Sequence, residues 1–467
     1  MKKLLISILL TLLILAGAYV GMAWKLGQDY EKGLATRFER WNNQPSVKEL
    51  GVMAKIDRME HGLFSTNAHY NISSTLLPSV KIPVSVQVKH GPIINLQPAR
   101  FQETHTLDND GLTNLWYKLT EGKVPISMTN NVTFAGNNKM TWELSPFSWS
   151  LADQRIEFSG LTSHVNIDSN KHMVGDYTLG HINVLNRQNV ILAIRDLKGN
   201  FDTHTDKIKS GFPEGSYLAE IGTIITKGIL QLNSISLEYK GTQKGDIAHI
   251  TQPISIGKIE VAGDDMGSLK ALIETENLNI ALYKEIQEKL QRGDKSAALD
   301  ILTNDLLKNK PSLKLDGQWN TNVGKIESNL KIVGRSKQPV GQEILDHIDH
   351  LDSHIAIPKD AFIKVVDAIW LINNTSDKET AHAMAQNIWE TLQKDPRAQI
   401  FFHNVGNTLV SDMTYDGQDR ITINGKNFTV AEFLNTALNP KKDTQPEQQT
   451  PPAEVEPSDQ VPNASPL

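Results

Sequence analysis

An alternation of apolar and polar residues, repeated over more than half of the chain, constrains the fold most strongly. From Val80 to Lys89, valine and isoleucine alternate with polar residues or proline, which is typical of a β-strand with one buried face. Pro83 predicts that this strand lies at a sheet edge or that the proline lies at the strand's end. The pattern recurs between about Lys48 and Ile280, in residues 155–167, 176–184, 190–197 and 229–239. Regular strands separated by turn residues predict a large antiparallel sheet.

Turn and helix signals complete the expected fold class. Gly136-Asn137-Asn138 lies between two short β patterns and predicts a hairpin, as does Asn424-Gly425 after Ile421-Thr422-Ile423. Thr429 and Glu432 have the spacing of a helix capping box. Helical periodicity predicts helices in residues 282–306, 361–372 and 381–392. We therefore expect an α+β, β-rich fold, for which an elongated, curved sheet is one option.

A weak internal echo links two of the predicted strands. Leu179–Val184 resembles Ile256–Val261, because each places a glycine after an apolar residue and then continues with alternating residues. Two copies are compatible with a structural repeat or with chance.

The N-terminal segment is the longest uncharged stretch. Leu4–Trp24 contains 21 residues without a charge, and as a helix it would span about 30 Å, the thickness of a bilayer's hydrocarbon core. Lys2 and Lys3 precede it, which predicts a cytoplasmic N-terminus. Ala16-Gly17-Ala18 leaves a cleaved signal peptide as the alternative, although the apolar run continues to Trp24. We expect one membrane-spanning helix, with the rest of the chain exported.

The remaining chain divides into three parts. Leu26, Tyr30, Leu34 and Phe38 recur every four residues, which predicts an amphipathic helix over residues 25–44 that Pro45 ends. The last 27 residues hold six of the 20 prolines and no aromatic residue, so we expect residues 441–467 to be a disordered tail. The predicted organisation is a cytoplasmic tip and anchor (1–24), the amphipathic helix (25–44), a β-rich domain (45–440) and the tail (441–467).

Composition excludes several classes of function. The chain has no cysteine, which removes disulfides, thiolate nucleophiles and cysteine-ligated metal centres. Its formal net charge of -6 argues against nucleic-acid binding, which normally requires a basic surface. Phosphate-binding, dinucleotide-binding, nucleophile-elbow and zinc-protease motifs do not occur in the sequence. We expect no enzyme activity and no cofactor.

Several short motifs, taken in order, resemble the YdgA-like family of bacterial proteins anchored in the inner membrane. They are Ala23-Trp24, His61-Gly62-Leu63-Phe64-Ser65-Thr66, Lys89-His90-Gly91-Pro92, Phe158-Ser159-Gly160, Ile357-Pro358, Ile421–Gly425 and the capping box. The family usually has arginine before the glycine at position 62, where this chain has His61. The resemblance implies a periplasmic β-rich domain on an inner-membrane anchor, capable of self-association. It implies no assigned biochemical function and no catalytic residue.

The densest group of candidate metal ligands lies between Asp346 and His354. Imidazole and carboxylate groups bind divalent metals, and on one helix His347, His350 and His354 would share a face. Two other interpretations compete with this one. Residues 351–357 alternate like a strand, which would disperse the histidines, and Ile344, Ile348 and Leu351 fit a plain amphipathic helix with polar residues facing solvent.

Two further groups are candidates for a site. His61-Gly62 and His90-Gly91-Pro92 supply imidazoles that could act as bases, although glycine and proline beside strands more often mark structural corners. Phe64 and Ser65 belong to the same motif. The aromatic residues Trp142, Phe147 and Trp149 fit either a sheet core or an apolar surface that binds a ligand or partner.

The function expected from the sequence is noncatalytic binding or assembly in the bacterial envelope. The chain would be held in the inner membrane through Leu4–Trp24, with self-association and lipid as candidate partners and no nucleic acid. One alternative is a lipid-handling module with an apolar groove on its sheet. The other is a metal-dependent hydrolase that uses the Asp346–His354 cluster.

Overall fold

The computed structural model describes residues 2–44, 47–48, 50–74, 80–204, 214–335, 344–373 and 377–433. The side chains at positions 2–13, 303, 308, 344 and 373 are outside the described part. The predicted tail, residues 441–467, also lies outside the described residues.

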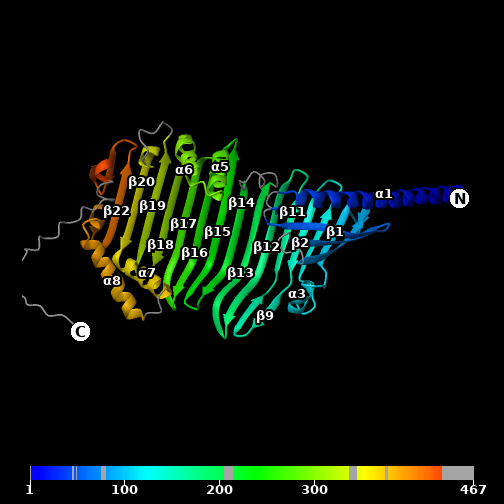
Figure 1. Cartoon of the computed structure of the whole chain (residues 1–467), viewed down its shortest axis with the longest axis horizontal. Coiled ribbons are helices and arrows are strands. Elements are labelled where there is room, and N and C mark those ends of the chain that lie inside the picture. The colour runs from blue at the N-terminus through cyan, green and yellow to red at the C-terminus, as the bar shows by residue number, and fades with distance from the viewer. Residues whose placement is uncertain are drawn as a thin grey trace, which may run out of the picture.

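In the described part, 22 strands form one sheet (Figure 1). The pairings are antiparallel, and most strands pair with their neighbours along the chain. Successive strands therefore alternate in direction, and each new strand lies farther along the long axis of the molecule. The strands before the centre are β1 (Val52–His61), β2 (Ser65–Ser74), β3 (Lys81–His90), β6 (Phe101–Leu107), β7 (Ile126–Val132), β8 (Asn138–Leu144), β9 (Phe147–Leu151), β10 (Gln154–Phe158) and β11 (Leu161–Ile167). A separate two-stranded sheet contains β4 (Ile93–Ile94) and β5 (Gln97–Pro98).

The longest strands form the centre of the sheet, and the shortest close its C-terminal end. The strands are β12 (His172–Asn186), β13 (Asn189–His204), β14 (Gly215–Thr226), β15 (Leu230–Lys244), β16 (Ile247–Val261), β17 (Asp264–Asn279), β18 (Ser312–Thr321), β19 (Gly324–Gly334), β20 (Ile348–Pro358), β21 (His403–Val405), β22 (Thr408–Tyr415), β23 (Arg420–Ile423) and β24 (Lys426–Thr429). Both β10 and β11 pair with the same long strand, β12, so β10 continues the line of β11. The expectation of a β-rich fold with a large antiparallel sheet is confirmed.

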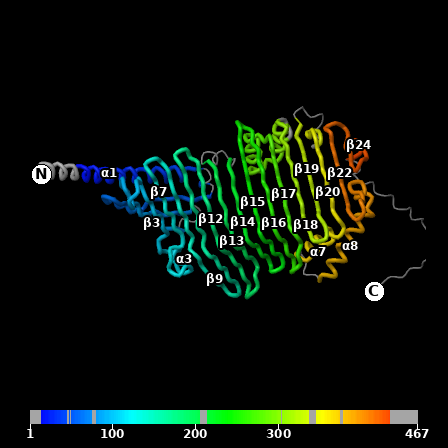
Figure 2. The backbone as a smooth tube through the Cα atoms, turned by 180° about the vertical axis from the view of Figure 1, so that it is seen from behind, coloured from blue at the N-terminus to red at the C-terminus, as the bar shows by residue number. Residues whose placement is uncertain are grey.

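The helix α1 (Lys2–Asn42) lies at one end of this sheet, α8 (Lys378–Lys394) lies near the other, and α5 (Ile280–Gln291), α6 (Lys295–Ile301) and α7 (Lys359–Asn373) lie along the edges of the strands between them (Figure 1). The helix α1 runs along the long axis, over the first strands, and projects beyond them; the view from behind agrees (Figure 2). The others are α3 (Thr113–Leu119) and α9 (Ala398–Phe401), with a π-helical turn at Leu302–Leu306 and 3-10 turns at Leu307–Asn309 and Ile344–His347.

The predicted anchor and amphipathic helix are one continuous helix, α1. Leu26, Tyr30 and Leu34 are buried against Val86 and Val88 of β3, as the four-residue spacing predicted. The first ten residues of the predicted span Leu4–Trp24 lack described side chains. Among the described residues, no helix has both the length and the apolar composition required to cross a bilayer.

The local turn and cap predictions are confirmed. Gly136-Asn137 joins β7 to β8, and Asn424-Gly425 joins β23 to β24 with positive φ at both residues. The Thr429 amide donates to Glu432 Oε2 at 2.8 Å, and the Glu432 amide donates to Thr429 Oγ1 at 3.1 Å, which completes the capping box. Pro83 lies near the start of β3, one residue before the pairing of β3 with β6 begins, so the proline marks a strand end and β3 is not an edge strand.

A line of irregular backbone crosses the five central strands β12 to β16. Asp196 and Ser234 have positive φ, and glycines stand in line with them on the other three strands, at Gly180, Gly222 and Gly257. A Cβ at Gly222 would lie 2.9 Å from Asp196 Cβ, and one at Gly257 would lie 2.9 Å from Ser234 Cβ. We call this line the crease. The similarity between Leu179–Val184 and Ile256–Val261 has its physical basis here, because Gly180 and Gly257, the second residues of the two segments, both lie in the crease.

Candidate functional site

One face of the sheet carries an unbroken row of large apolar side chains that runs perpendicular to the strands. Its members are register partners on eleven strands that are neighbours in the sheet, namely β7, β8 and β11 to β19. At about 4.8 Å between strands, the row is about 48 Å long. The members of this central row are Ile126, Leu144, Leu161, Leu179, Leu197, Ile221, Ile235, Ile256, Leu269, Trp319 and Ile326.

The crease keeps this face apolar by shifting the alternation of side chains. In each of the strands β12 to β16, the next apolar register row begins three residues from the central row instead of two. In β16 the step runs from Ile256 to Ile259, and both pack in one cluster with Leu232 of β15, so they share a face. The next row is Phe158, Ile182, Ile194, Ile224, Leu232 and Ile259. Positive φ at Asp196 and Ser234 allows this shift on β13 and β15.

The opposite face is charged. Between the apolar positions, the same strands place Lys198 beside Glu220 at 3.2 Å and Lys314 beside Asp316 at 2.7 Å. These ion pairs are largely exposed, so solvent screens them and they contribute little to stability. The sheet is therefore amphipathic, with one apolar face and one face suited to water.

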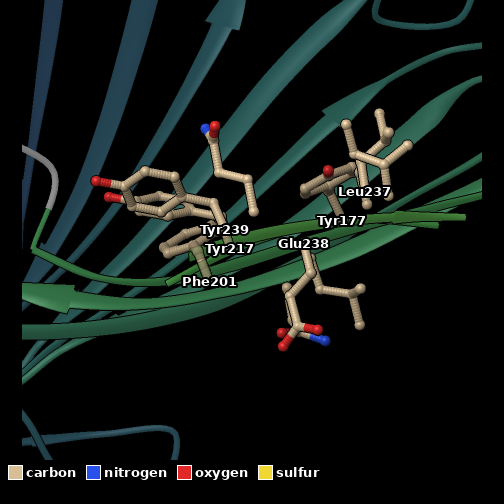
Figure 3. Close-up of a pocket in the computed structure, with 11 residues that line it drawn as sticks. Tyr177, Phe201, Tyr217, Leu237, Glu238 and Tyr239 are labelled. Carbon is tan, nitrogen blue, oxygen red and sulfur yellow. The ribbon is translucent and has the colours of Figure 1, made fainter. Parts of the chain in front are cut away.

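Helices cover the apolar face over β2 and β3 and over parts of β15 to β18, where Ile256, Leu269 and Trp319 of the central row pack in the cluster that contains Ala368 of α7. At the N-terminal end, α1 packs on Ala68, Val86 and Val88. At the C-terminal end, α7 packs through Val365 and Ala368 on the cluster around Ile259, and α5 packs through Ile286 on the cluster around Ala248. Between them, a pocket of about 370 Å³ lies over β12 to β16 and is lined mainly by aromatic and aliphatic side chains (Figure 3).

The aromatic candidates from the sequence lie on this apolar face. Trp142 of β8 pairs with Ser163, which pairs with Tyr177 of the pocket, and its side chain is 40% exposed. Phe147 pairs with Phe158 at the end of the row beyond the crease, and Trp149 pairs with Ile156 in the row after it. The three side chains are therefore spread along one apolar face and do not form a single compact core.

The two histidine–glycine motifs form the surface on which α1 packs, which we call the seat of α1. His90 is 2% exposed; its Nδ1 lies 2.9 Å from the Ala23 carbonyl of α1, and its Nε2 lies 3.2 Å from Thr66 Oγ1. His61 stacks on His90 with ring centroids 5.5 Å apart. Burial lowers the pKa of His90, which favours the neutral ring. The interpretation of these motifs as a structural corner is therefore supported, and the corner holds a helix.

The glycines and neighbours of these motifs complete the seat. A Cβ at Gly27 of α1 would lie 2.2 Å from His61 Cε1, so the helix can approach the histidines only because that position is glycine. Gly91, with φ of 154°, lies beside Ala23, and Gly62 lies in the turn before Ser65. Phe64 contacts the ring of Tyr19, while Pro92 precedes β4.

A buried carboxylate beside this seat was not among the predicted sites. Glu103 of β6 is 2% exposed and accepts hydrogen bonds from Arg37 Nη1 at 3.1 Å and from His105 Nε2 at 3.2 Å. Burial acts to raise the pKa of Glu103, but the His105 hydrogen bond and the Arg37 charge outweigh it and hold that pKa below its usual range. The alternation of Phe101, Glu103 and Leu107 was the available signal, since it places the carboxylate on the apolar face.

The Asp346–His354 cluster does not converge. The helical interpretation of this segment is wrong, because a 3-10 turn at Ile344–His347 leads directly into β20. His350 and His354 are four residues apart on that strand, a separation of about 13 Å along the backbone. His354 Nδ1 instead lies 2.6 Å from Asp412 Oδ1, and the His347 side chain is buried. Extended backbone thus disperses the imidazoles, as the alternation of residues 351–357 indicated.

Another group on the charged face has the composition of a metal site. His249, Glu274 and Glu276 bring one ligand atom each to within 4.8 Å of one another. His249 lies 3.6 Å from Glu274 and 3.9 Å from Glu276, and its side chain is 40% exposed. Exposed groups of this composition are common in proteins without a metal, so the cluster carries no assignment.

Comparison with known proteins identifies a family. No curated protein and no solved structure matches the chain. A family model described as bacterial protein of unknown function (DUF945) matches residues 1–431, which include all the strands of the sheet. The chain belongs to the DUF945 family of bacterial proteins.

Proposed function

We propose that this protein is a noncatalytic envelope protein whose apolar sheet face binds the acyl chains of lipids. The central row carries this proposal, because eleven neighbouring strands place large aliphatic or aromatic side chains on one line. Nine of its members are partly exposed, and Leu179 and Ile235 are buried. A contiguous apolar surface of this length on a soluble protein usually binds something. The row of about 48 Å is about three times the thickness of one lipid leaflet's hydrocarbon layer, about 15 Å.

An anchor in the inner membrane is part of the proposal. Its support is the uncharged sequence Leu4–Trp24 and the projection of α1 beyond the sheet (Figures 1 and 2). On that projecting part, Ile14 and Leu15 are 64% and 60% exposed, and both would be stabilised by an apolar surrounding. The rest of the chain would then lie in the periplasm. The resemblance to the YdgA-like family, carried by the motifs that seat α1, agrees with this placement.

The direction of α1 sets how the apolar face would meet the membrane. The helix runs along the long axis of the sheet, whereas the long central strands run across that axis (Figure 1). A helix that crosses the membrane would therefore direct the central row away from the bilayer, with β7 nearest and β19 farthest. Acyl chains leaving the bilayer would reach the apolar face beyond the part that α1 covers and before the part that α7 covers.

Photo-crosslinking in the full-length chain tests this function. Leu237 lines the pocket on the apolar face and is 42% exposed, while Ser236 points to the opposite face. Benzoylphenylalanine at position 237, activated by light in intact membranes, should yield protein–lipid adducts in intact-mass spectra. The same group at position 236 is the matched control and should yield few.

The outcomes separate lipid binding from self-association. A mass increase of one lipid at position 237 supports the proposal. An adduct of twice the protein mass at position 237 would instead show that a second copy covers the apolar face. Equal lipid adducts at both positions would contradict specific binding, since they would report only proximity to the membrane.

A further inference from the structure

The pocket on the apolar face is built around aromatic residues of neighbouring strands. Phe201, Tyr217 and Tyr239 are successive register partners on β13, β14 and β15, and Tyr177 of β12 lies in the adjacent row. Tyr217 and Tyr239 meet edge to face, with ring centroids 5.7 Å apart. Figure 3 shows both hydroxyl groups directed the same way, away from Leu237 and Tyr177. The pocket therefore has a hydroxyl side and an aliphatic side.

Glycines on neighbouring strands make room for two of these rings. A Cβ at Gly175 would lie 2.4 Å from Phe201 Cζ, and a Cβ at Gly199 would lie 2.4 Å from the Tyr177 ring. Because these positions lack side chains, the rings lie down against the sheet and the space above them stays open. The rings are therefore held flat against the sheet, while the Tyr239 hydroxyl itself is buried, so a ligand would reach it after a neighbouring side chain moves.

The Tyr239 hydroxyl is buried and makes no hydrogen bond to the described part of the chain. Burial raises the pKa of Tyr239 to about 12, so the group is a neutral donor at physiological pH. Buried hydroxyls are nearly always paired, because an unpaired one carries a desolvation cost. An acceptor atom on a ligand would remove that cost.

The surroundings of this hydroxyl favour an uncharged acceptor. On the apolar face, the other residues around the pocket are aromatic or aliphatic, apart from Gln252. Glu238 also borders the pocket, but it points to the opposite face (Figure 3). The described residues that line the pocket include no lysine or arginine. A phosphate would therefore bring a charge that these residues do not pair, whereas an ester carbonyl is neutral and adjoins the acyl chain.

We propose that Tyr239 donates a hydrogen bond to an acyl-ester carbonyl of a glycerolipid whose chains lie on Leu237, Ile254 and the central row. This inference rests on the proposed lipid-binding function and specifies the ligand as an ester-linked lipid. The hydroxyl side of the pocket would receive the glycerol region, and the charged headgroup would remain outside.

A comparison of ester and ether lipids tests the inference. The full-length chain with benzoylphenylalanine at position 254 is reconstituted in vesicles of equimolar diacyl and dialkyl-ether phosphatidylethanolamine with matched chains. Loss of one neutral hydrogen bond corresponds to about a three- to tenfold change in preference. The unmodified pocket should therefore give about three to ten diacyl adducts for each diether adduct. The variant Tyr239→Phe should give a ratio near one.

The control variant is Tyr177→Phe, which removes a hydroxyl from the neighbouring ring and should keep the diacyl preference. A ratio near one in the unmodified pocket, or a preference that survives Tyr239→Phe, would overturn this inference while leaving lipid binding intact. Absence of any lipid adduct would contradict the proposed function itself.

Discussion

At the scale of single residues, the closest approach between helix and sheet depends on Gly27. Replacing it with alanine would place a methyl group against His61 and His90, and His90 cannot move freely because both ring nitrogens are within hydrogen-bond distance of a partner. We expect Gly27→Ala to lower the free energy of unfolding by about 1–3 kcal/mol, the usual cost of overpacking. Chemical denaturation of the full-length chain measures this change.

Gly33 in the same helix is the matched control. A Cβ there would meet no atom within 4 Å, so Gly33→Ala should be neutral or should stabilise the protein by up to about 1 kcal/mol through helix propensity. Equal effects of the two substitutions would show that Gly27 is not the contact point between α1 and the sheet.

The burial of His90 under α1 predicts how the stability of the protein depends on pH. Its folded pKa is lowered by burial, whereas the unfolded value is about 6.5. The unfolded chain therefore takes up a proton at this residue more readily, and stability falls as the pH decreases below about 6.5. The thermal midpoint of the wild type should fall between pH 7.5 and pH 5.5 more than that of His90→Gln, which does not titrate. A parallel decrease in both proteins would argue against this role.

At the scale of elements, the crease explains why the amphipathic pattern of the central strands is not a simple alternation. The sequence predicts one stretch of alternation over residues 176–184, but the alternation shifts by one residue between Leu179 and Ile182. Register pairing shows that the same shift occurs in neighbouring strands, so one apolar face continues through it. The glycines were visible in the sequence, but the positive φ of Asp196 and Ser234 was not.

The glycine at the middle of the crease gives a test of that element. In Gly222→Ala, the new methyl group would lie 2.9 Å from Asp196 Cβ, and we expect a loss of about 1–3 kcal/mol of stability. Gly317→Ala on β18 is the control, because its Cβ would be 3.7 Å from the nearest atom, an ordinary contact. Chemical denaturation should give Gly222→Ala a clearly lower free energy of unfolding than Gly317→Ala. The reverse order would contradict the close packing at the crease.

A feature of the fold could be predicted when the residues that determine it are close together in the sequence. The hairpin at Asn424-Gly425, the capping box and the helix repeat from Leu26 to Phe38 are local, and they are confirmed. The pairing of Gly27 with His90 and the line from Ile126 to Ile326 join residues far apart in sequence, so no local pattern could reveal them. The histidine spacing in Asp346–His354 suited a helix, but the β pairing of that segment prevailed.

At the scale of the whole molecule, a single charge on the apolar face should disturb ligand binding without unfolding the sheet. Leu237 is 42% exposed, so Leu237→Glu should change stability by less than about 1 kcal/mol. A carboxylate there would have to be buried by a bound acyl chain, which is costly. We expect lipid adducts at a crosslinker at position 254 to decrease at least about tenfold, as measured by intact-mass spectrometry.

The control introduces the same charge on the opposite face. Ser255 is paired with Lys270, so Ser255→Glu gains a cationic neighbour and should leave lipid adducts unchanged. If both variants lost lipid equally, net charge would explain the effect and the apolar face would not.

The most direct test of the central claim is a crosslinking scan along the central row in the full-length chain. Benzoylphenylalanine is placed at Leu144, Leu161 and Ile221, and at the adjacent positions Glu143, Thr162 and Glu220 on the other face. We predict lipid adducts at all three positions of the row and few at their neighbours, from β8 through β14. Adducts on both faces alike, or on neither, would contradict a continuous lipid-binding face.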